Sequence, residues 1–353
     1  MKARPSNIVS IAQLAEFSDR IDARSPAEYA LDHIPCAISH PVLDDGQRAS
    51  IGTLHKQDSA FAAKKTGAAM VARNIAAMLE SSFADHPREW RPLIYCWRGG
   101  KRSAALTHVL NEIGWKAVRL DGGYKAYRRQ VIADLAQLPE RFSYRVICGV
   151  TGSGKSRLLR ALGVAGAQVL DLEALARHRG SLLGDLPDAA QPSQKGFESA
   201  LWEHFNRLDP GRPVFVESES KKVGEVRVPQ NLIERMWQSP CLRVEATLIS
   251  RFGLLREEYA HFIADPEALH EKLEHLSALR GAAAMARWRA LSQAGDWDAL
   301  VESLLVEHYD PAYLRSMRLN YPQYDSAAAV ELAGINDADF SAAAARLAAE
   351  FGA

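Results

Sequence analysis

Short apolar runs alternate with stretches of helical periodicity over the first 250 residues of the chain. In the first third, the runs Leu93-Ile94-Tyr95-Cys96 and Ala117-Val118-Arg119-Leu120 flank residues 104–113, whose apolar spacing predicts a helix. The second run closes at the turn Asp121-Gly122-Gly123. Because strands that alternate with helices form parallel sheets covered on both faces, this part of the chain is predicted to be an α/β domain.

The pattern restarts near Leu138-Pro139-Glu140, where a second α/β region begins. A strand is predicted at Tyr144-Arg145-Val146-Ile147-Cys148, and a glycine-rich turn and a helix starting near Lys155 follow it. After about residue 254, helical periodicity dominates and no strand is predicted. The expected fold class is therefore α/β, with a parallel-sheet domain at residues 1–137, a second α/β domain at 138–251 and a helical C-terminal region at 252–353.

The composition is that of a globular protein with an uneven distribution of charge. Hydrophobic residues make up 47% and charged residues 24% of 353 residues, enough chain for about two domains. The 43 basic and 43 acidic residues balance, but Arg91–Arg129 holds nine basic and two acidic residues, and 251–353 holds nine basic and sixteen acidic. A basic stretch can attract a polyanion, although an ordinary solvated surface explains it equally well.

Neither a membrane protein nor a disulfide scaffold is expected. No apolar run approaches the roughly 20 residues that span a bilayer, and no apolar segment follows the first seven residues as in a signal peptide. We therefore expect a cytoplasmic protein. The cysteines lie far apart without a zinc-like spacing, at Cys36, Cys96, Cys148 and Cys241.

A phosphate-binding loop is predicted where the second α/β region begins. The segment from Gly149 to Ser156 fits G-x-x-x-x-G-K-[ST] in full, between a predicted strand and a predicted helix. Its backbone N–H groups and the helix N-terminus would surround a phosphate or diphosphate, and Lys155 would add a positive charge. The residues expected at the phosphate are Gly149, Thr151, Gly152, Ser153, Gly154, Lys155 and Ser156. Two carboxylates that follow predicted strands, Asp171 and Glu217, are candidates to act beside it, and Ser156 is a candidate Mg²⁺ ligand.

A second candidate loop, Cys96-Trp97-Arg98-Gly99-Gly100-Lys101-Arg102-Ser103, begins at Cys96. A cysteine between a strand and a helix N-terminus is surrounded by N–H groups, and the side chains of Arg98, Lys101 and Arg102 further favour its thiolate. The same loop could hold a tetrahedral oxyanion. Two chemistries therefore remain open: transfer of a chalcogen, and a phosphatase in which Cys96 attacks phosphorus and the arginine of Cys-x₅-Arg binds the oxyanion.

Several separated segments resemble known families. Those at 21–29 (IDARSPAEY), 33–37 (HIPCA), the Cys96 loop and 121–127 (DGGYKAY) look like a rhodanese domain, whose cysteine carries a chalcogen, with Cys36 where rhodaneses usually have glycine. Joined to a phosphate-binding loop, the chain resembles the tRNA 2-selenouridine synthases over nearly its whole length. Further matching segments are GTLHKQ at 52–57, DLEALARHRGS at 171–181, ESES at 217–220 and YDPAY at 309–313.

The resemblance implies a two-step modification of the wobble uridine in a tRNA anticodon stem-loop. The sulfur of 2-thiouridine would first be alkylated with geranyl diphosphate, whose diphosphate suits the phosphate-binding loop. Selenium from selenophosphate would then replace the S-geranyl group. Cys96 would carry that selenium as a selenylsulfide, while Arg98, Lys101 and Arg102 stabilise the departing phosphate. A selenophosphate-supplying enzyme is an expected partner, and Trp202 and Phe205 are candidates for the geranyl slot.

The basic stretch is the expected track for the tRNA backbone. Candidate contacts are Lys125, Arg128, Arg129, Arg177 and Arg179, and Trp97 is a candidate to stack on the splayed base. Three other functions compete with this interpretation: the phosphatase, a P-loop kinase with an accessory rhodanese domain, and a non-enzymatic RNA-binding module. Phosphate release dependent on Cys96 would favour the first, and phosphorylation independent of Cys96 the second.

Overall fold

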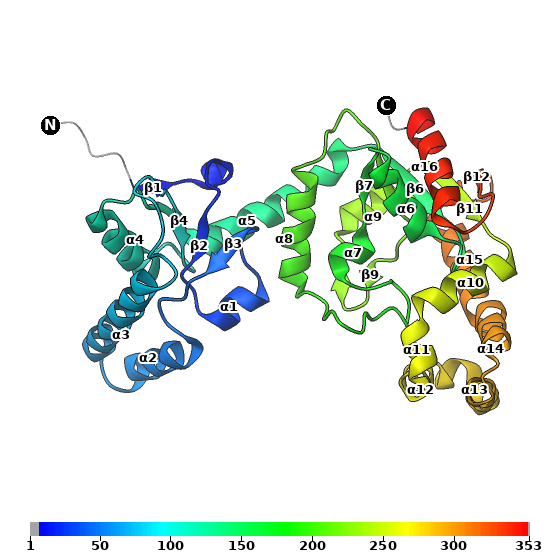
Figure 1. The fold of residues 1–353 in the computed structure, drawn as a ribbon, viewed down its shortest axis with the longest axis horizontal. Coiled ribbons are helices and arrows are strands. Elements are labelled where there is room, and N and C mark those ends of the chain that lie inside the picture. Colours follow the sequence, from blue (N-terminus) through cyan, green and yellow to red (C-terminus); the bar gives the residue numbers. More distant parts are fainter. Residues whose placement is uncertain (1–6, 352–353) are drawn as a thin grey trace. The chain divides into compact units, whose positions relative to one another are not determined.

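The computed structural model describes residues 7–351, which divide into two compact units (Figure 1). Unit 1 comprises the described residues up to Leu135 together with Ser193–Glu203, and unit 2 comprises Ala136–Pro192 and the residues from His204 onward. Each unit contains a five-stranded, fully parallel sheet. The predicted α/β fold class is therefore confirmed.

The sheet of unit 1 has the order β1-β5-β4-β2-β3. Its strands are β1 Ile8–Val9, β2 Arg20–Asp22, β3 Ala37–Ser39, β4 Leu93–Tyr95 and β5 Val118–Leu120. Its helices are η1 Ile11–Glu16, α1 Pro26–Leu31, α2 Asp45–Gln57, α3 Ala60–Glu80, α4 Lys101–Ile113, α5 Gly123–Leu135 and most of α8 Gln194–Phe205. Ile75 of α3 and Leu106 of α4 pack in one apolar cluster with Ile94 of the central strand, so these helices cover one face of the sheet.

The sheet of unit 2 has the order β12-β11-β6-β8-β7. Its strands are β6 Tyr144–Cys148, β7 Gln168–Leu170, β8 Val214–Glu217, β11 Cys241–Glu245 and β12 Ala328–Glu331, beside a short antiparallel pair, β9 Lys222–Val223 and β10 Val226–Arg227. Its first helices are η2 Leu138–Arg141, α6 Lys155–Val164, α7 Leu172–Ala176 and α9 Gln230–Trp237. The helices that follow β11 are α10 Leu248–Glu258, α11 Ala260–Ala264, α12 Pro266–Glu274, α13 Ser277–Gln293, α14 Trp297–Leu304, the π-helix η3 Leu305–Tyr309, α15 Asp310–Asn320 and α16 Asp337–Phe351.

Two features differ from the expectations drawn from the sequence. Residues 193–203 belong to unit 1, although they lie within the range expected for the phosphate-loop domain. The C-terminal region is mostly helical, as predicted, but the expectation of no strand after residue 254 was wrong, because β12 pairs with β11 from Leu242↔Ala328 to Glu245↔Glu331. Only Val330 of β12 is buried, and the alanines around it favour helix over strand, so the sequence pattern did not indicate a strand here.

Unit 2 contains two separate apolar cores. Leu158 of α6, Phe215 of β8 and Phe340 of α16 pack in a core on the sheet. A second core lies among α11–α14, where Trp288 and Leu300 are each 1% exposed. The late helices therefore complete the sheet core and also build a core of their own.

No helix among residues 7–351 is both long and apolar enough to cross a membrane.

Candidate active-site loops

Cys96 follows the central strand β4 and is buried, with 3% of its surface exposed. Its Sγ lies 3.2 Å from Oγ of Ser103 in the first turn of α4. The loop is held against the start of α5, where the amide of Tyr124 donates to the Cys96 carbonyl over 2.9 Å. Gly123 has a φ of 57°, and a Cβ there would lie 2.2 Å from that carbonyl oxygen, so this close approach requires glycine.

The three predicted cations of the loop differ in their surroundings. Arg98 and Lys101 are exposed, whereas the guanidinium of Arg102 pairs with Glu28 at 2.7 Å. Burial would raise the pKa of Glu28, but the hydrogen bond and charge of Arg102 outweigh it and lower that pKa. Glu28 also contacts Arg48 at 3.1 Å, so a carboxylate of α1 holds Arg102 in place.

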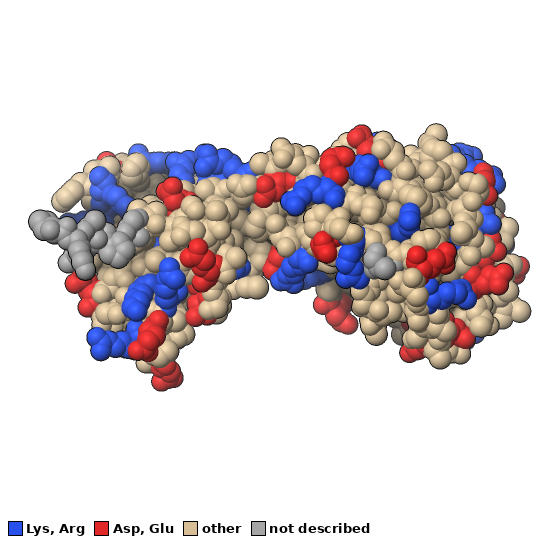
Figure 2. Space-filling view, turned by 90° about the horizontal axis from the view of Figure 1, so that it is seen from above, with Lys and Arg blue, Asp and Glu red and all other residues tan. Residues whose placement is uncertain are grey.

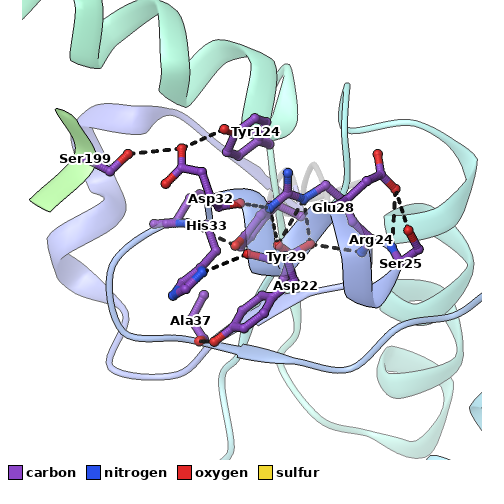
Figure 3. Close-up of polar contacts among 12 residues, drawn as sticks. Asp22, Arg24, Ser25, Glu28, Tyr29, Asp32, His33, Ala37, Tyr124 and Ser199 are labelled. Carbon is purple, nitrogen blue, oxygen red and sulfur yellow. Dashed lines mark hydrogen bonds and ion pairs between the residues drawn. The ribbon is translucent and has the colours of Figure 1, made fainter. Parts of the chain in front are cut away.

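A buried ion pair fixes the segment that carries the rhodanese-like signature (Figure 3). Arg24 is 1% exposed, and its Nε donates to both carboxylate oxygens of Asp22 at 2.9 Å. Its Nη2 donates to the carbonyl of Asp32 at 2.6 Å, and its guanidinium lies 3.9 Å from the ring centroid of Tyr124. These contacts tie the α1 segment to the helix that follows the sheet, so the signature residues have a structural role.

Asp32 extends this network to α8 (Figure 3). Its Oδ2 accepts hydrogen bonds from Tyr124 at 2.6 Å and from Ser199 at 3.1 Å. Burial raises the pKa of Asp32 despite these hydrogen bonds and the nearby charge of Arg128. Residues of α8 are thus bonded directly to the core of unit 1.

Cys36 is exposed and has a φ of 62°, in the left-handed region that favours glycine. This conformation gives the physical reason for the glycine that rhodaneses usually have there. The Sγ of Cys36 lies 4.0 Å from the carboxylate of Glu203.

The basic residues of α5 divide between two faces of the helix. Lys125 and Arg129 are exposed and one turn apart. Arg128 does not belong to this surface, because it is 8% exposed and its guanidinium binds the Glu198 carboxylate and, at 3.1 Å, Ser199 Oγ. The space-filling view shows Lys and Arg side chains gathered along one edge of unit 1 (Figure 2).

The phosphate-binding loop joins β6 to α6, as predicted, and later helices brace it. The φ values of Gly152 and Gly154 are 77° and 88°, and a Cβ on either residue would meet Leu255 or Phe340 within 3 Å. The amide of Gly149 donates to the Tyr313 hydroxyl, and Lys155 Nζ donates to the Gly149 carbonyl, each over 2.8 Å.

A buried arginine supports the other side of the same loop. The Nε of Arg251 donates to the Thr151 carbonyl at 2.9 Å, and its two terminal nitrogens bind both oxygens of Asp310 at 2.9 and 2.6 Å. Asp310 and Tyr313 belong to the predicted YDPAY segment. That segment therefore serves the loop, a role that its sequence alone did not indicate.

Three glutamates lie together beside the loop. Glu173, Glu217 and Glu219 each place a carboxylate oxygen within 4.8 Å of the others, and Ser156 Oγ donates to Glu173 at 3.3 Å. Burial and mutual repulsion raise the pKa of each carboxyl to about 8, although the charge of Lys155 opposes the shift. Among the described residues, Oε1 of Glu217 has no hydrogen-bond partner.

Of the two predicted carboxylates, only Glu217 joins this cluster. Asp171 caps α7 by accepting a hydrogen bond from the amide of Ala174 at 2.8 Å. Glu173 and Glu219 were missed, although each lies two residues after a predicted carboxylate, and this spacing was the available signal.

The loop opens into a cavity of about 330 Å³. Its wall includes Lys155, Arg160, Arg179, Glu173 and Glu217. Arg179 therefore faces this cavity, and its Nη1 is buried without a hydrogen-bond partner among the described residues. Arg177, the C-cap of α7, is exposed.

The aromatic residues considered for RNA and geranyl contacts have other neighbours. Trp97 packs against Tyr124 with ring centroids 5.4 Å apart. Trp202 belongs to unit 1, where its indole N–H donates to Asp134 at 2.8 Å, and Phe205 packs on Phe142 in unit 2. Neither Trp202 nor Phe205 lines the phosphate-loop cavity.

These two loops define a protein with a rhodanese-like domain joined to a P-loop domain, and family models agree. A rhodanese-like domain matches residues 11–130, and a tRNA 2-selenouridine synthase AAA domain matches residues 142–280. Curated proteins named tRNA 2-selenouridine synthase match at length. The protein from Sulfurovum sp. is 32% identical over 83% of this chain and 87% of its own length, and that from Cupriavidus necator is 33% identical over 83% and 86%. The chain therefore belongs to the tRNA 2-selenouridine synthase family.

The match with the protein of the same name from Nitrosomonas europaea is 36% identical over 68% of this chain, and it spans 63% of that relative's length. Among solved structures, a rhodanese-related protein from Thermoplasma volcanium aligns with 35% of this chain and 90% of its own at 18% identity. The TM-score of this alignment is 0.23.

Proposed function

We propose that this chain converts 2-thiouridine at the wobble position of tRNA to 2-selenouridine through an S-geranyl intermediate. The observation that carries the proposal is the presence of two chemically distinct loops in one chain. A cysteine at a helix N-terminus suits selenophosphate, and a phosphate-binding loop with adjoining cations suits a diphosphate donor. Family membership supplies the tRNA substrate.

The first step belongs to the phosphate-binding loop. The sulfur of 2-thiouridine attacks C1 of geranyl diphosphate, the C1–O bond breaks, and the diphosphate leaves with the bonding electrons. Lys155, Arg160 and Arg179 line the cavity and would stabilise this negative charge, together with the loop amides. The unpartnered Nη1 of Arg179 supports a role in anion binding.

The residues beside the loop also fit a divalent cation. Mg²⁺ prefers oxygen ligands such as carboxylates. The Oε1 of Glu217 is buried without a hydrogen-bond partner among the described residues, so it is available to bind a cation. Glu173, Glu217 and Glu219 would hold the ion. Bound there, Mg²⁺ would supply positive charge to the diphosphate.

The second step belongs to Cys96. As a selenium carrier, its thiolate attacks selenium, and the Se–P bond breaks with its electrons passing to phosphorus. The phosphorus then leaves as phosphite, and not as the phosphate expected above. The terminal selenium of the selenylsulfide attacks C2 and expels geranylthiolate, after which a thiol reductant must cleave the S–Se bond.

A redox-neutral route uses the same loop differently, and the Cys-x₅-Arg spacing with Ser103 Oγ at 3.2 Å from Sγ favours it. Here Cys96 attacks phosphorus, selenide leaves, and the selenide displaces geranylthiolate from C2. Water then hydrolyses the phosphocysteine to phosphate. Phosphorus NMR separates the routes, since phosphite indicates the selenylsulfide and phosphate the phosphocysteine.

The test is mass spectrometry of tRNA nucleosides after incubation with geranyl diphosphate and selenophosphate. Cys96→Ser should accumulate S-geranyl-2-thiouridine without selenation, whereas Lys155→Ala should lower geranylation at least 10-fold. Cys36→Gly, which suits the left-handed backbone, is the matched cysteine control and should keep both steps. Selenated base from Cys96→Ser, or normal geranylation by Lys155→Ala, would overturn the assigned roles.

A further inference from the structure

A second cavity adjoins the phosphate-loop cavity in unit 2. Its volume is about 70 Å³, and it shares four wall residues with the larger cavity: Thr151, Ser181, Leu255 and Tyr259. The rest of its wall is largely hydrocarbon, contributed chiefly by Leu183, Phe262, Leu269, Trp297, Leu300 and Leu304. The two cavities therefore lie against the same four residues, and one is charged while the other is apolar.

The apolar cavity lies within the separate core of the late helices. Leu183, Phe262, Leu269, Leu300 and Leu304 all belong to that core and are at most 7% exposed. Protein interiors are normally close-packed, and an unfilled apolar cavity lowers stability in proportion to its volume. A cavity retained here, next to a phosphate site, is what a ligand with an apolar part would fill.

We propose that this cavity binds the hydrocarbon chain of the allylic diphosphate whose diphosphate group occupies the phosphate-binding loop. The inference rests on the proposed function and adds to it the residues that hold the chain. A ligand that spans both cavities must have an anionic end near Lys155 and Arg179 and an apolar end among Leu300, Leu304 and Phe262. A prenyl diphosphate has this distribution of charge.

The size of the cavity favours a short, thin chain. At about 10–15 Å³ for each water-sized group, 70 Å³ accommodates roughly five to seven such groups, so the cavity would hold the far part of a ten-carbon geranyl chain and the part next to the diphosphate would lie in the larger cavity. Three of its polar wall residues, Thr151, Ser181 and Tyr259, are shared with the phosphate-loop cavity and so lie where the two cavities meet. The other wall residues with polar atoms are Arg256, Trp297 and Tyr309, and the remaining wall is hydrocarbon, which would limit the length of the chain.

The experiment is a competition among dimethylallyl, geranyl and farnesyl diphosphates at equal concentrations, with S-alkylated tRNA nucleosides measured by mass spectrometry. The ratio of products does not depend on how much enzyme is folded. Leu300→Ala should raise the ratio of farnesyl to geranyl product at least 10-fold, and Leu304→Phe should raise the ratio of dimethylallyl to geranyl product similarly. Leu273→Ala is the matched control, because Leu273 belongs to the same core but not to the cavity wall.

The outcomes separate the two proposals. Absence of geranyl product from the wild-type protein would refute the proposed function itself. If the wild-type protein forms geranyl product but Leu300→Ala and Leu304→Phe keep its product ratios within twofold, the chain-binding cavity is refuted while the function stands. An equal change in Leu273→Ala would also refute it, since the effect would then come from a loosened core.

Discussion

At the scale of single residues, the three glutamates beside the phosphate-binding loop are the clearest case of chemistry created by folding. Glu173 and Glu219 are 46 positions apart, and the parallel order of β7 and β8 brings their segments together. The amine of Lys155 donates to the Gly149 carbonyl. Its positive charge lowers the pKa of the glutamates, but burial and mutual repulsion raise that pKa by more. A sequence pattern predicts neither the short distance between these carboxylates nor their burial.

The raised pKa of Glu217 gives a testable dependence of stability on pH. Its value of about 8 in the folded protein exceeds the usual 4.5, so the folded state retains a proton that the unfolded state releases between these values. This group therefore destabilises the fold as pH rises from 4.5 to 8. Between pH 6 and 8.5 this raised pKa costs the wild type about 2–3 kcal/mol of stability, so Glu217→Gln should lose less thermal stability than the wild type, by about 5 °C or more in Tm.

Thermal denaturation at the two pH values, with and without Mg²⁺, makes this measurement. Mg²⁺ should raise the Tm of the wild type more at pH 8.5 than at pH 6, because it no longer competes with protons. Glu302→Gln, at an exposed position of α14, is the control and should keep the wild-type dependence. An identical dependence in Glu217→Gln would show that this carboxyl does not titrate in the window.

At the scale of elements, α5 shows how a charge pattern misleads when helical periodicity is ignored. Arg128 lies in the most basic stretch of the chain and was therefore assigned to the RNA. In the helix it shares a buried face with Tyr124, Tyr127 and Val131. The spacing of these apolar residues in the sequence was the signal that separates Arg128 from Arg129, which is exposed.

Replacing Arg128 should therefore destabilise unit 1. Arg128→Ala leaves Glu198 and Asp32 without their cation, and the loss of one partner of a buried pair typically costs about 3–5 kcal/mol. Hydrogen exchange across α5 and α8 is the measurement, because the chain has two units and does not allow a simple two-state analysis. Arg129→Ala on the same helix should leave exchange unchanged, and equal protection in both variants would contradict the prediction.

At the scale of the whole molecule, the sequence predicted the parallel sheets and both loops but not the residues that brace them. The order of strand, loop and helix depends on neighbouring residues, and short apolar runs and glycines in the sequence predict it. Arg251 and Tyr313 bind the phosphate-binding loop from 100 and 164 residues away in the sequence, and Asp310 holds Arg251. Those contacts depend on how the late helices return to the sheet, which local patterns do not specify.

Charge distribution at this scale predicts where tRNA binds. The chain has no net charge, so attraction to the RNA backbone must come from local surfaces such as the exposed pair Lys125 and Arg129. Lys125→Ala and Arg129→Ala should each weaken binding of an anticodon stem-loop several-fold. Each should also reduce the slope of log K against log salt by about 0.7–0.9, the value for one lost phosphate contact.

Fluorescence anisotropy with a labelled stem-loop between 50 and 200 mM salt measures both quantities. Arg315→Ala, an exposed arginine in the acidic C-terminal region, is the matched control and should change neither affinity nor slope. Arg179→Ala should lower S-alkylation while leaving tRNA affinity intact, because Arg179 lines the phosphate-loop cavity. An unchanged salt slope in both Lys125→Ala and Arg129→Ala would show that neither side chain contacts a phosphate, and the RNA would then bind another surface. An equal loss of affinity in Arg315→Ala would also contradict the prediction.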